Sequence, residues 1–167
     1  MRKLGKATDA RMAMLKGQVT DLLWYGRIET TLSRGKDVAR MAEKLLTLAI
    51  NTYTDTVEVS KNIKNDKGEV VVRNVINDGP KKLAARRRLM ANLYDVQERK
   101  ERGESKSKYF ARIRDIKHPL IEKIFNEYAK KYDARNQETK QGGGYTRILR
   151  LGKRVGDDAE VVIVELV

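Results

Sequence analysis

Arg27-Ile28-Glu29-Thr30-Thr31-Leu32 decides the fold class, because this short stretch separates two segments that have helical patterns. It is rich in β-branched residues and its side chains alternate, which predicts a short strand or an extended link. The segment before it has apolar residues at helical spacing and predicts a helix over residues 9–25, stopped by Gly26. The segment after it predicts a second helix from Ser33 to about Ile50.

The rest of the chain supplies further helices and a closing pair of strands. Residues 55–78 predict a β-hairpin, and Pro80 and Pro119 each begin a further helix. The strand-like runs 145–151 and 159–167 are expected to pair antiparallel. Helices first, with strands at the end and a short strand between helices, is an order typical of an α+β fold.

We therefore expect one domain over residues 1–167, with about four helices packed on a small mixed sheet. An extended basic arm over residues 1–8 precedes the first helix in this interpretation, because nothing apolar in it could hold it down. Residues 98–108 are too highly charged to bury, so they predict an exposed helix end followed by a mobile loop.

The chain is strongly basic, and its charge is concentrated. Lysine and arginine number 36 against 23 aspartates and glutamates, which gives a net charge of +13 over 167 residues. Residues 1–50 have a net charge of +5 and residues 81–118 have +8, so two blocks hold the excess. A solvated face is the plain interpretation of one charge run, but two separate basic blocks favour a polyanionic partner.

The composition also excludes several kinds of chemistry. The absence of cysteine excludes a disulfide scaffold, thiolate metal sites and a cysteine nucleophile. A single histidine, His118, cannot form a histidine-rich metal site, and its place before Pro119 indicates a structural role. We expect no metal, cofactor or small-molecule substrate. The basic start lacks the apolar segment of a secretory signal, and no apolar run approaches the ~20 residues of a membrane span, which indicates an intracellular chain without membrane contact.

Thirteen side chains are candidates for contact with nucleic acid. They are Arg2, Lys3, Lys6, Arg11, Lys16, Arg34, Lys36, Arg40, Arg86, Arg87, Arg88, Tyr145 and Arg147. The basic residues of the arm and the first helix can follow a phosphate backbone and release counterions. The alternative is that the arm is only a disordered, solubilising tail.

The other candidates come from two short motifs. Arg86, Arg87 and Arg88 span about 200° of a helix surface, so at least two of them must point to solvent or to a ligand such as phosphate. Ion pairs with Asp95 and Glu98 are the alternative. Tyr145-Thr146-Arg147 follows the Gly142-Gly143-Gly144 run and suits stacking on a base or contact with a sugar-phosphate, with a packing tyrosine as the equal alternative.

Two other functional classes remain open at this point. A DNA-binding module could use the basic first helix, although no helix-turn-helix spacing or zinc ligands are present. A nuclease could use Asp157 and Asp158 with a metal ion, but acidic residues are ordinary in a turn between strands and no acid–base partner lies nearby.

The sequence resembles bacterial large-subunit ribosomal protein seventeen. The blocks that carry the resemblance are Ile28-Glu29-Thr30-Thr31-Leu32 near the start and Gly143-Gly144-Tyr145-Thr146-Arg147-Ile148-Leu149 near the end, in the family's order. Arg87-Arg88-Leu89 and Lys123-Ile124-Phe125-Asn126-Glu127 are similar to the family's middle helices. Residues 55–78 and 98–117 lie outside the resemblance and look like insertions.

The resemblance implies a structural constituent of the large subunit of the cytoplasmic ribosome, which supports translation. It implies binding to large-subunit ribosomal RNA near the exit of the peptide tunnel, among neighbouring ribosomal proteins. It also implies that the chain is not an enzyme and needs no cofactor. The expected fold of the family, a small α+β domain with a basic N-terminus, agrees with the interpretation of the residues.

Overall fold

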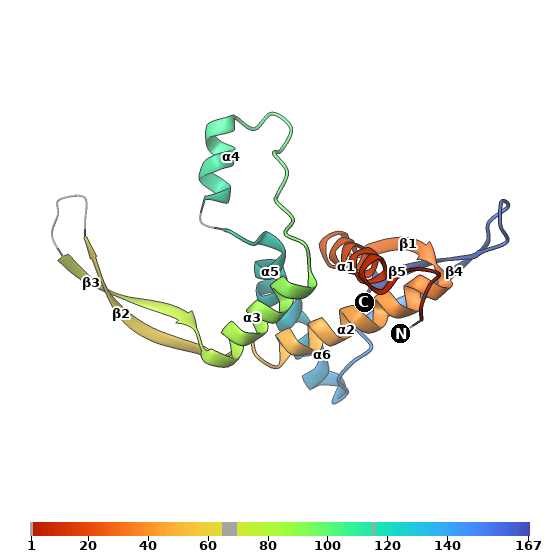
Figure 1. Cartoon of the computed structure of the whole chain (residues 1–167). Coiled ribbons are helices and arrows are strands. Elements are labelled where there is room, and N and C mark those ends of the chain that lie inside the picture. The colour runs from red at the N-terminus through yellow and green to blue at the C-terminus, as the bar shows by residue number, and fades with distance from the viewer. Residues whose placement is uncertain (1, 65–69, 115) are drawn as a thin grey trace.

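The computed structural model describes residues 2–64, 70–114 and 116–167. Figure 1 shows a central body from which a β-hairpin, a helix-containing lobe and a strand-connecting loop project in three directions. The elements in chain order are α1 (Thr8–Tyr25), β1 (Arg27–Thr31), α2 (Leu32–Ile50), β2 (Thr56–Lys64), β3 (Val70–Asp78), α3 (Pro80–Asn92), α4 (Lys106–Ile113), α5 (Pro119–Lys123), the π-helical turn η1 (Ile124–Tyr128), α6 (Ala129–Thr139), β4 (Thr146–Lys153) and β5 (Glu160–Leu166).

The body contains a three-stranded sheet in the order β1-β5-β4, so the predicted early strand and the closing pair meet in one sheet. The α+β class is confirmed. The expectation of a mixed sheet is wrong, because both strand pairs are antiparallel. In register, Thr30 lies opposite Val162, and Ile148 lies opposite Val164. Val162 and Val164 are fully buried and mark the face of the sheet that the helices cover.

Helix α2 is the centre of the core and contacts α1, α3, α6 and both longer strands of the sheet. The sequence explains this position, because Val38, Ala42, Leu46 and Ala49 recur at helical spacing and are all fully buried. Gly35 allows the start of the helix to approach the sheet, since a Cβ there would lie 2.9 Å from a methyl group of Val162.

The predicted fourth helix is confirmed as the continuous run α5–η1–α6. Pro119 begins it, and its apolar side chains Leu120, Ile121, Phe125 and Tyr132 are buried, whereas Tyr128 is half-buried. Tyr132 packs against Tyr145, with 4.9 Å between the ring centroids, so this helix run is joined to the start of β4.

The predicted hairpin is confirmed as the antiparallel pair β2–β3, which points away from the body in Figure 1. The sequence Asn65-Asp66-Lys67-Gly68 is typical of a hairpin turn, and it lies outside the described residues. At the base of the hairpin, the Asp55 carboxylate accepts backbone hydrogen bonds from Lys81 (2.8 Å) and Lys82 (3.2 Å). Asp55 thus satisfies N–H groups at the start of α3, where Gly79 has no side chain to do so.

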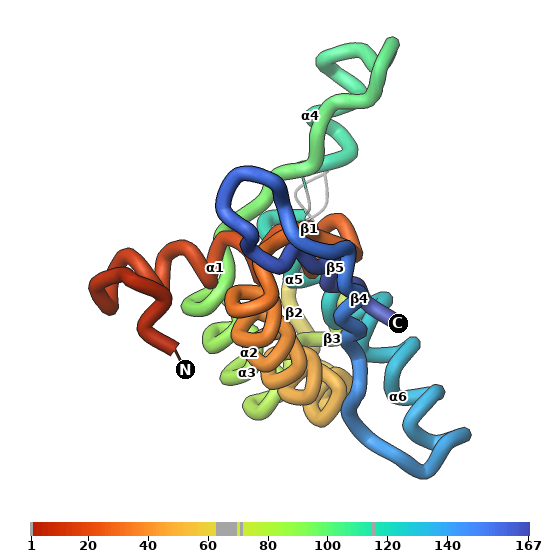
Figure 2. Tube along the Cα trace, turned by 90° about the vertical axis from the view of Figure 1, so that its right-hand side faces the viewer, coloured from red at the N-terminus to blue at the C-terminus, as the bar shows by residue number. Residues whose placement is uncertain are grey.

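The charged segment after α3 differs from the prediction. Helix α3 ends at Asn92, and the short helix α4 forms over residues that were expected in part to be a loop. The reason is local, because the Ser105 hydroxyl caps α4 by accepting a hydrogen bond from the backbone N–H of Lys108. The lobe that contains α4 extends away from the body in both views (Figures 1 and 2).

The N-terminal arm is also different from the extended segment that was expected. The backbone N–H of Lys6 donates to the carbonyl of Lys3 at 3.2 Å, which closes a turn, and Leu4 packs against the hydrophobic core. The arm is therefore folded back on the body. Sequence reasoning missed this because Leu4 is a single apolar residue among basic ones.

Candidate nucleic-acid interface

Asp37 joins the basic arm to the basic start of α2. Its side chain is 5% exposed, and its Oδ2 accepts a hydrogen bond from the backbone N–H of Arg2 at 3.2 Å. Arg2 also donates from its guanidinium to the Ser33 hydroxyl at 3.2 Å. On the other side, Arg40 Nη1 lies 3.9 Å from Asp37 Oδ1. One buried carboxylate thus holds two separate stretches of cationic chain together.

The arm and the start of α2, joined in this way, carry six of the candidate cations, and we call this part of the molecule the arm surface. Its members are Arg2, Lys3, Lys6, Arg34, Lys36 and Arg40. Five of the six residues are exposed, and Arg34 is half-buried. Figure 1 shows the N-terminus beside the start of α2, in agreement with the contact between Arg2 and Asp37. The arrangement presents guanidinium and ammonium groups to solvent, as binding to a phosphate backbone requires.

Arg34 extends the arm surface toward the β4–β5 loop. It lines an open cavity of about 310 Å³ together with Gln18, Glu29 and Arg154. Arg154 is held by Asp157, with 2.6 Å between Nη2 and Oδ2. This bond and the backbone N–H of Ala159 outweigh desolvation and lower the pKa of Asp157 to about 2. Sequence reasoning missed Arg154, because nothing in its own segment indicated that α2 would lie beside it.

Arg11 and Lys16 are placed differently although both lie on α1. Arg11 is half-buried, and its Nη2 donates to the Thr8 hydroxyl at 3.5 Å. Lys16 faces the end of α3, where its ammonium donates to the carbonyl of Ala91 at 3.1 Å. It also lies 4.7 Å from the centre of the Tyr94 ring. Lys16 therefore ties α1 to the segment after α3.

The three consecutive arginines of α3 divide into two roles. Arg86 turns inward, where its Nε lies 2.6 Å from Asp78 Oδ2 and its Nη1 lies 2.5 Å from Glu122 Oε1. Burial disfavours the charged forms, but the hydrogen bonds outweigh it, so the pKa of Arg86 is raised and that of Asp78 is lowered. Arg87 and Arg88 are exposed. As expected for three consecutive helical residues, two of the three arginines point to solvent, and the third points inward.

Tyr145 is 2% exposed and lies in the core rather than on the surface. Its ring packs on Tyr132, and the Arg135 guanidinium lies 5.1 Å from the centre of the Tyr145 ring. The hydroxyl accepts a hydrogen bond from Asn136 at 3.0 Å. A ring in this position cannot stack on a base, so the packing alternative describes it. Arg147 is exposed on β4 and is paired with Glu165.

The glycine run before Tyr145 has a structural function. Gly143 and Gly144 have φ values of 93° and 62°, which lie in the left-handed region that favours glycine. Arg135 donates to the carbonyl of Gly143 at 2.5 Å and to that of Gly144 at 3.2 Å. The run therefore makes the turn through which the chain enters β4, and Arg135 holds it in place.

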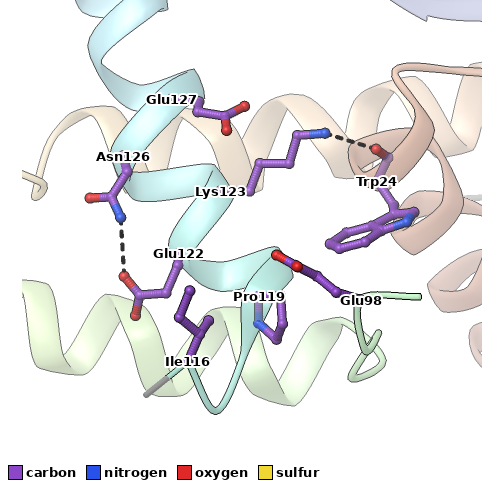
Figure 3. A pocket seen from close by; sticks show the side chains of 8 residues that line it. All are labelled: Trp24, Glu98, Ile116, Pro119, Glu122, Lys123, Asn126 and Glu127. Carbon is purple, nitrogen blue, oxygen red and sulfur yellow. Dashed lines mark hydrogen bonds between the residues drawn. The ribbon is translucent and has the colours of Figure 1, made fainter. Parts of the chain in front are cut away.

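One open cavity is a poor site for nucleic acid, because carboxylates line it and its lysine is engaged. It measures about 410 Å³ and is lined by the carboxylates of Glu98, Glu122 and Glu127, with Trp24 and Lys123 beside them (Figure 3). Lys123 is engaged there, because its ammonium donates to the carbonyl of Trp24 at 2.9 Å. Glu98 and Glu122 are paired with Arg112 and Arg86, so the cavity itself offers phosphate no cation, among the described residues, that is not already engaged.

The two carboxylates considered for metal chemistry, those of Asp157 and Asp158, both form ion pairs with basic side chains. Asp157 is paired with Arg154, and Asp158 lies 2.6 Å from the Lys153 ammonium. Over residues 2–64, 70–114 and 116–167, no group of three or more acidic or histidine side chains could hold a metal ion. His118 lies 3.3 Å from Asp95, in a contact between the segment after α3 and the start of α5. In the same part of the chain, no helix is long and apolar enough to cross a bilayer.

Comparison with known proteins agrees with the motifs at both ends of the chain. The family described as "Ribosomal protein L17" matches residues 14–167. The "Large ribosomal subunit protein bL17" of Lachnospira eligens is 37% identical over 185 residues, covering 99% of this chain and 98% of the relative. Those of Acetivibrio thermocellus and Ruminiclostridium cellulolyticum are 37% and 39% identical over 190 residues, with the same coverage. The chain belongs to the ribosomal protein L17 family, whose members are structural components of the ribosome and not enzymes.

Proposed function

We propose that this chain binds large-subunit ribosomal RNA through its arm surface, near the exit of the peptide tunnel and beside neighbouring ribosomal proteins. Family membership makes it a structural constituent of the large subunit in the cytoplasmic ribosome. The observation that carries the proposal is the joining of Arg2 and Arg40 at the buried carboxylate of Asp37. The location at the tunnel exit is supported by the family resemblance.

The proposed mechanism is electrostatic clamping of the phosphate backbone. Each cation that contacts a phosphate releases condensed counterions, so binding weakens steeply as salt rises. Because Asp37 holds the arm against α2, the cations of both segments can meet the RNA without first ordering the arm. Such contacts fix register and orientation, and they carry no direct information about base sequence.

A second set of contacts is proposed on other faces. Arg87 and Arg88 are exposed on α3 and form the second anchor. Arg147 is 61% exposed on β4 and Arg11 lies beside the arm, so both can add phosphate contacts. The proposal leaves Arg86 and Lys16 out of the interface, because protein groups hold them and both are partly buried, whereas Arg147 is paired with Glu165 but largely exposed. Tyr145 is also left out, because it is buried in the core, where it packs against Tyr132.

The experiment measures affinity for a large-subunit RNA fragment over a range of salt concentrations. Replacing Arg2, Lys3 and Lys6 with glutamine should flatten the plot of log affinity against log salt by about 0.7–0.9 for each phosphate that the variant no longer neutralises. The control replaces Lys44, Lys130 and Lys140 with glutamine, which removes the same number of positive charges. These lysines are exposed outside the proposed interface, so the control should change the salt slope much less.

Equal slopes for the two triple variants would contradict the proposal, because the effect would then come from net charge alone. Equal affinity of the wild-type chain for double-stranded DNA of the same length would favour a general nucleic-acid-binding module instead. The location is tested by footprinting large subunits assembled with and without the chain. Protection of RNA near the tunnel exit is the expected result. Protection only at distant sites would overturn the proposed location.

A further inference from the structure

The lobe formed by residues 98–114, 116 and 117 stands apart from the core, although it contains a helix. In Figures 1 and 2 this lobe extends away from the sheet and from α2. None of the eight residues of α4, all of which the structure describes, is buried. A helix of this length is not stable alone in water, so polar contacts within the lobe must hold it.

Arg112 is the centre of these internal contacts. It is paired with Glu98 and Glu104, and its Nη2 lies 3.2 Å from Glu104 Oε2. The hydrogen bond from Arg112 lowers the pKa of the Glu104 carboxyl, which therefore stays charged. The Tyr109 hydroxyl donates to the carbonyl of Glu98 at 2.8 Å, on the same side of the helix. The lobe thus uses two of its acidic groups internally.

This use of the carboxylates leaves the outer side of the lobe cationic. Residues 98–117 carry eight basic and four acidic side chains, a net charge of +4. Lys106, Lys108 and Arg114 are exposed and form no ion pair among the described residues. Three cations on one small projection repel one another, and a polyanion would relieve that repulsion.

An exposed aromatic ring lies beside one of these cations, Lys106. Phe110 is 53% exposed, and the ammonium of Lys106 lies 5.9 Å from the centre of its ring. The Tyr109 ring is its aromatic neighbour at 5.6 Å. An exposed ring beside cations is the arrangement with which proteins stack on unpaired bases while holding the neighbouring phosphates.

We propose that this lobe is a second RNA-binding element, in which Phe110 stacks on an unpaired base, Lys106 and Arg114 contact the flanking phosphates, and Lys108, on the opposite face of α4, adds a further phosphate contact. The inference rests on the proposed function and names a separate contact for the same RNA. Charge argues for RNA over a protein partner, because Lys106, Lys108 and Arg114 are exposed without an ion pair among the described residues and a polyanion matches all three. The carboxylates of Glu98 and Glu122 line the cavity at the root of the lobe.

Two variants of the full chain separate stacking from charge. Phe110→Ala should lower affinity for large-subunit RNA roughly tenfold and leave the salt slope unchanged, because a base stack is removed and no charge is changed. Alanine is a better helix former than phenylalanine and Phe110 is not in the core, so the variant keeps its fold. Replacing Lys106, Lys108 and Arg114 with glutamine should flatten the slope by about 0.7 for each phosphate left without a cation.

The control is again the glutamine variant of Lys44, Lys130 and Lys140, which lie outside the lobe. If the arm variant reduces binding but both lobe variants bind like this control, the lobe inference is overturned and the proposed function stands. If the wild-type chain fails to bind the RNA, the proposed function itself fails. A photo-reactive residue at position 110 in assembled large subunits should crosslink to RNA, and a crosslink to a protein would overturn the assignment.

Discussion

Gly35 of α2 lies directly against Val162 of β5, with too little space between them for another carbon atom. A Cβ on Gly35 would be 2.9 Å from Cγ2 of Val162 and 3.1 Å from Cγ2 of Val164. Gly35 itself has an ordinary φ, so close packing and not backbone geometry is what requires glycine there. The contact sets how closely the basic start of α2 approaches the sheet.

Gly35→Ala should therefore destabilise the fold by about 1–3 kcal/mol, the usual cost of overpacking a core. Urea unfolding followed by circular dichroism measures this change as a lower midpoint. Gly142→Ala is the matched control, because nothing lies within 4 Å of a Cβ at Gly142. Equal midpoints for the two variants would show that α2 shifts freely on the sheet.

Asp55 provides a second test, at the base of the hairpin. Asp55→Ala removes the acceptor for the backbone N–H groups of Lys81 and Lys82 and should cost about 1 kcal/mol, as the loss of a helix cap does. Asp55→Asn keeps an acceptor oxygen and should recover most of the loss. Thermal unfolding of the two variants measures their stability. An equal loss of stability in both would assign the effect to the lost charge instead of to capping.

Periodicity and turn chemistry were enough to predict most of the fold. The helical spacing of Leu15, Val19 and Leu22 predicted α1, and these residues are fully buried. Proline at the first position predicted where α3 and α5 begin. Helix α4 was not predicted in full, because its stability depends on Ser105 and on charge pairs and not on an apolar stripe.

The candidate site was less accessible to sequence reasoning, because its geometry depends on distant contacts. Arg86, Arg87 and Arg88 are the same residue type in one run, and Glu122, 36 positions beyond Arg86, helps to select which one turns inward. The contact between Arg2 and Asp37 likewise joins positions 35 residues apart. No local pattern encodes either contact.

The two roles of the arginines on α3 can be separated experimentally. Arg86→Gln leaves Asp78 and Glu122 without their shared partner and should lower the free energy of unfolding by about 1–3 kcal/mol. Arg87→Gln removes an exposed charge and should change stability by less than about 0.5 kcal/mol while flattening the salt slope of RNA binding. Chemical unfolding measures the stability of each variant, and RNA titration over a range of salt concentrations measures the salt slope of each. The opposite pattern would place Arg86 in the interface.

Tyr132 makes stability sensitive to alkaline pH. Burial, together with Tyr128, raises the pKa of Tyr132 to about 12, although Arg135 acts in the opposite direction. In the unfolded chain the group ionises near pH ~10, so its neutral form contributes stability that is fully present below that pH. This contribution is lost as the pH rises from about 10 toward about 12.

Tyr132→Phe should remove part of this alkaline loss, because phenylalanine cannot ionise. The Tyr132 hydroxyl is buried without a hydrogen-bond partner among the described residues, so its removal should leave stability at pH 7 equal or higher by about 1 kcal/mol. Urea unfolding at pH 7 and pH 11 measures both effects. A variant that is less stable at pH 7 would show that the hydroxyl is satisfied in solution, and an unchanged alkaline loss would assign the titration to another tyrosine.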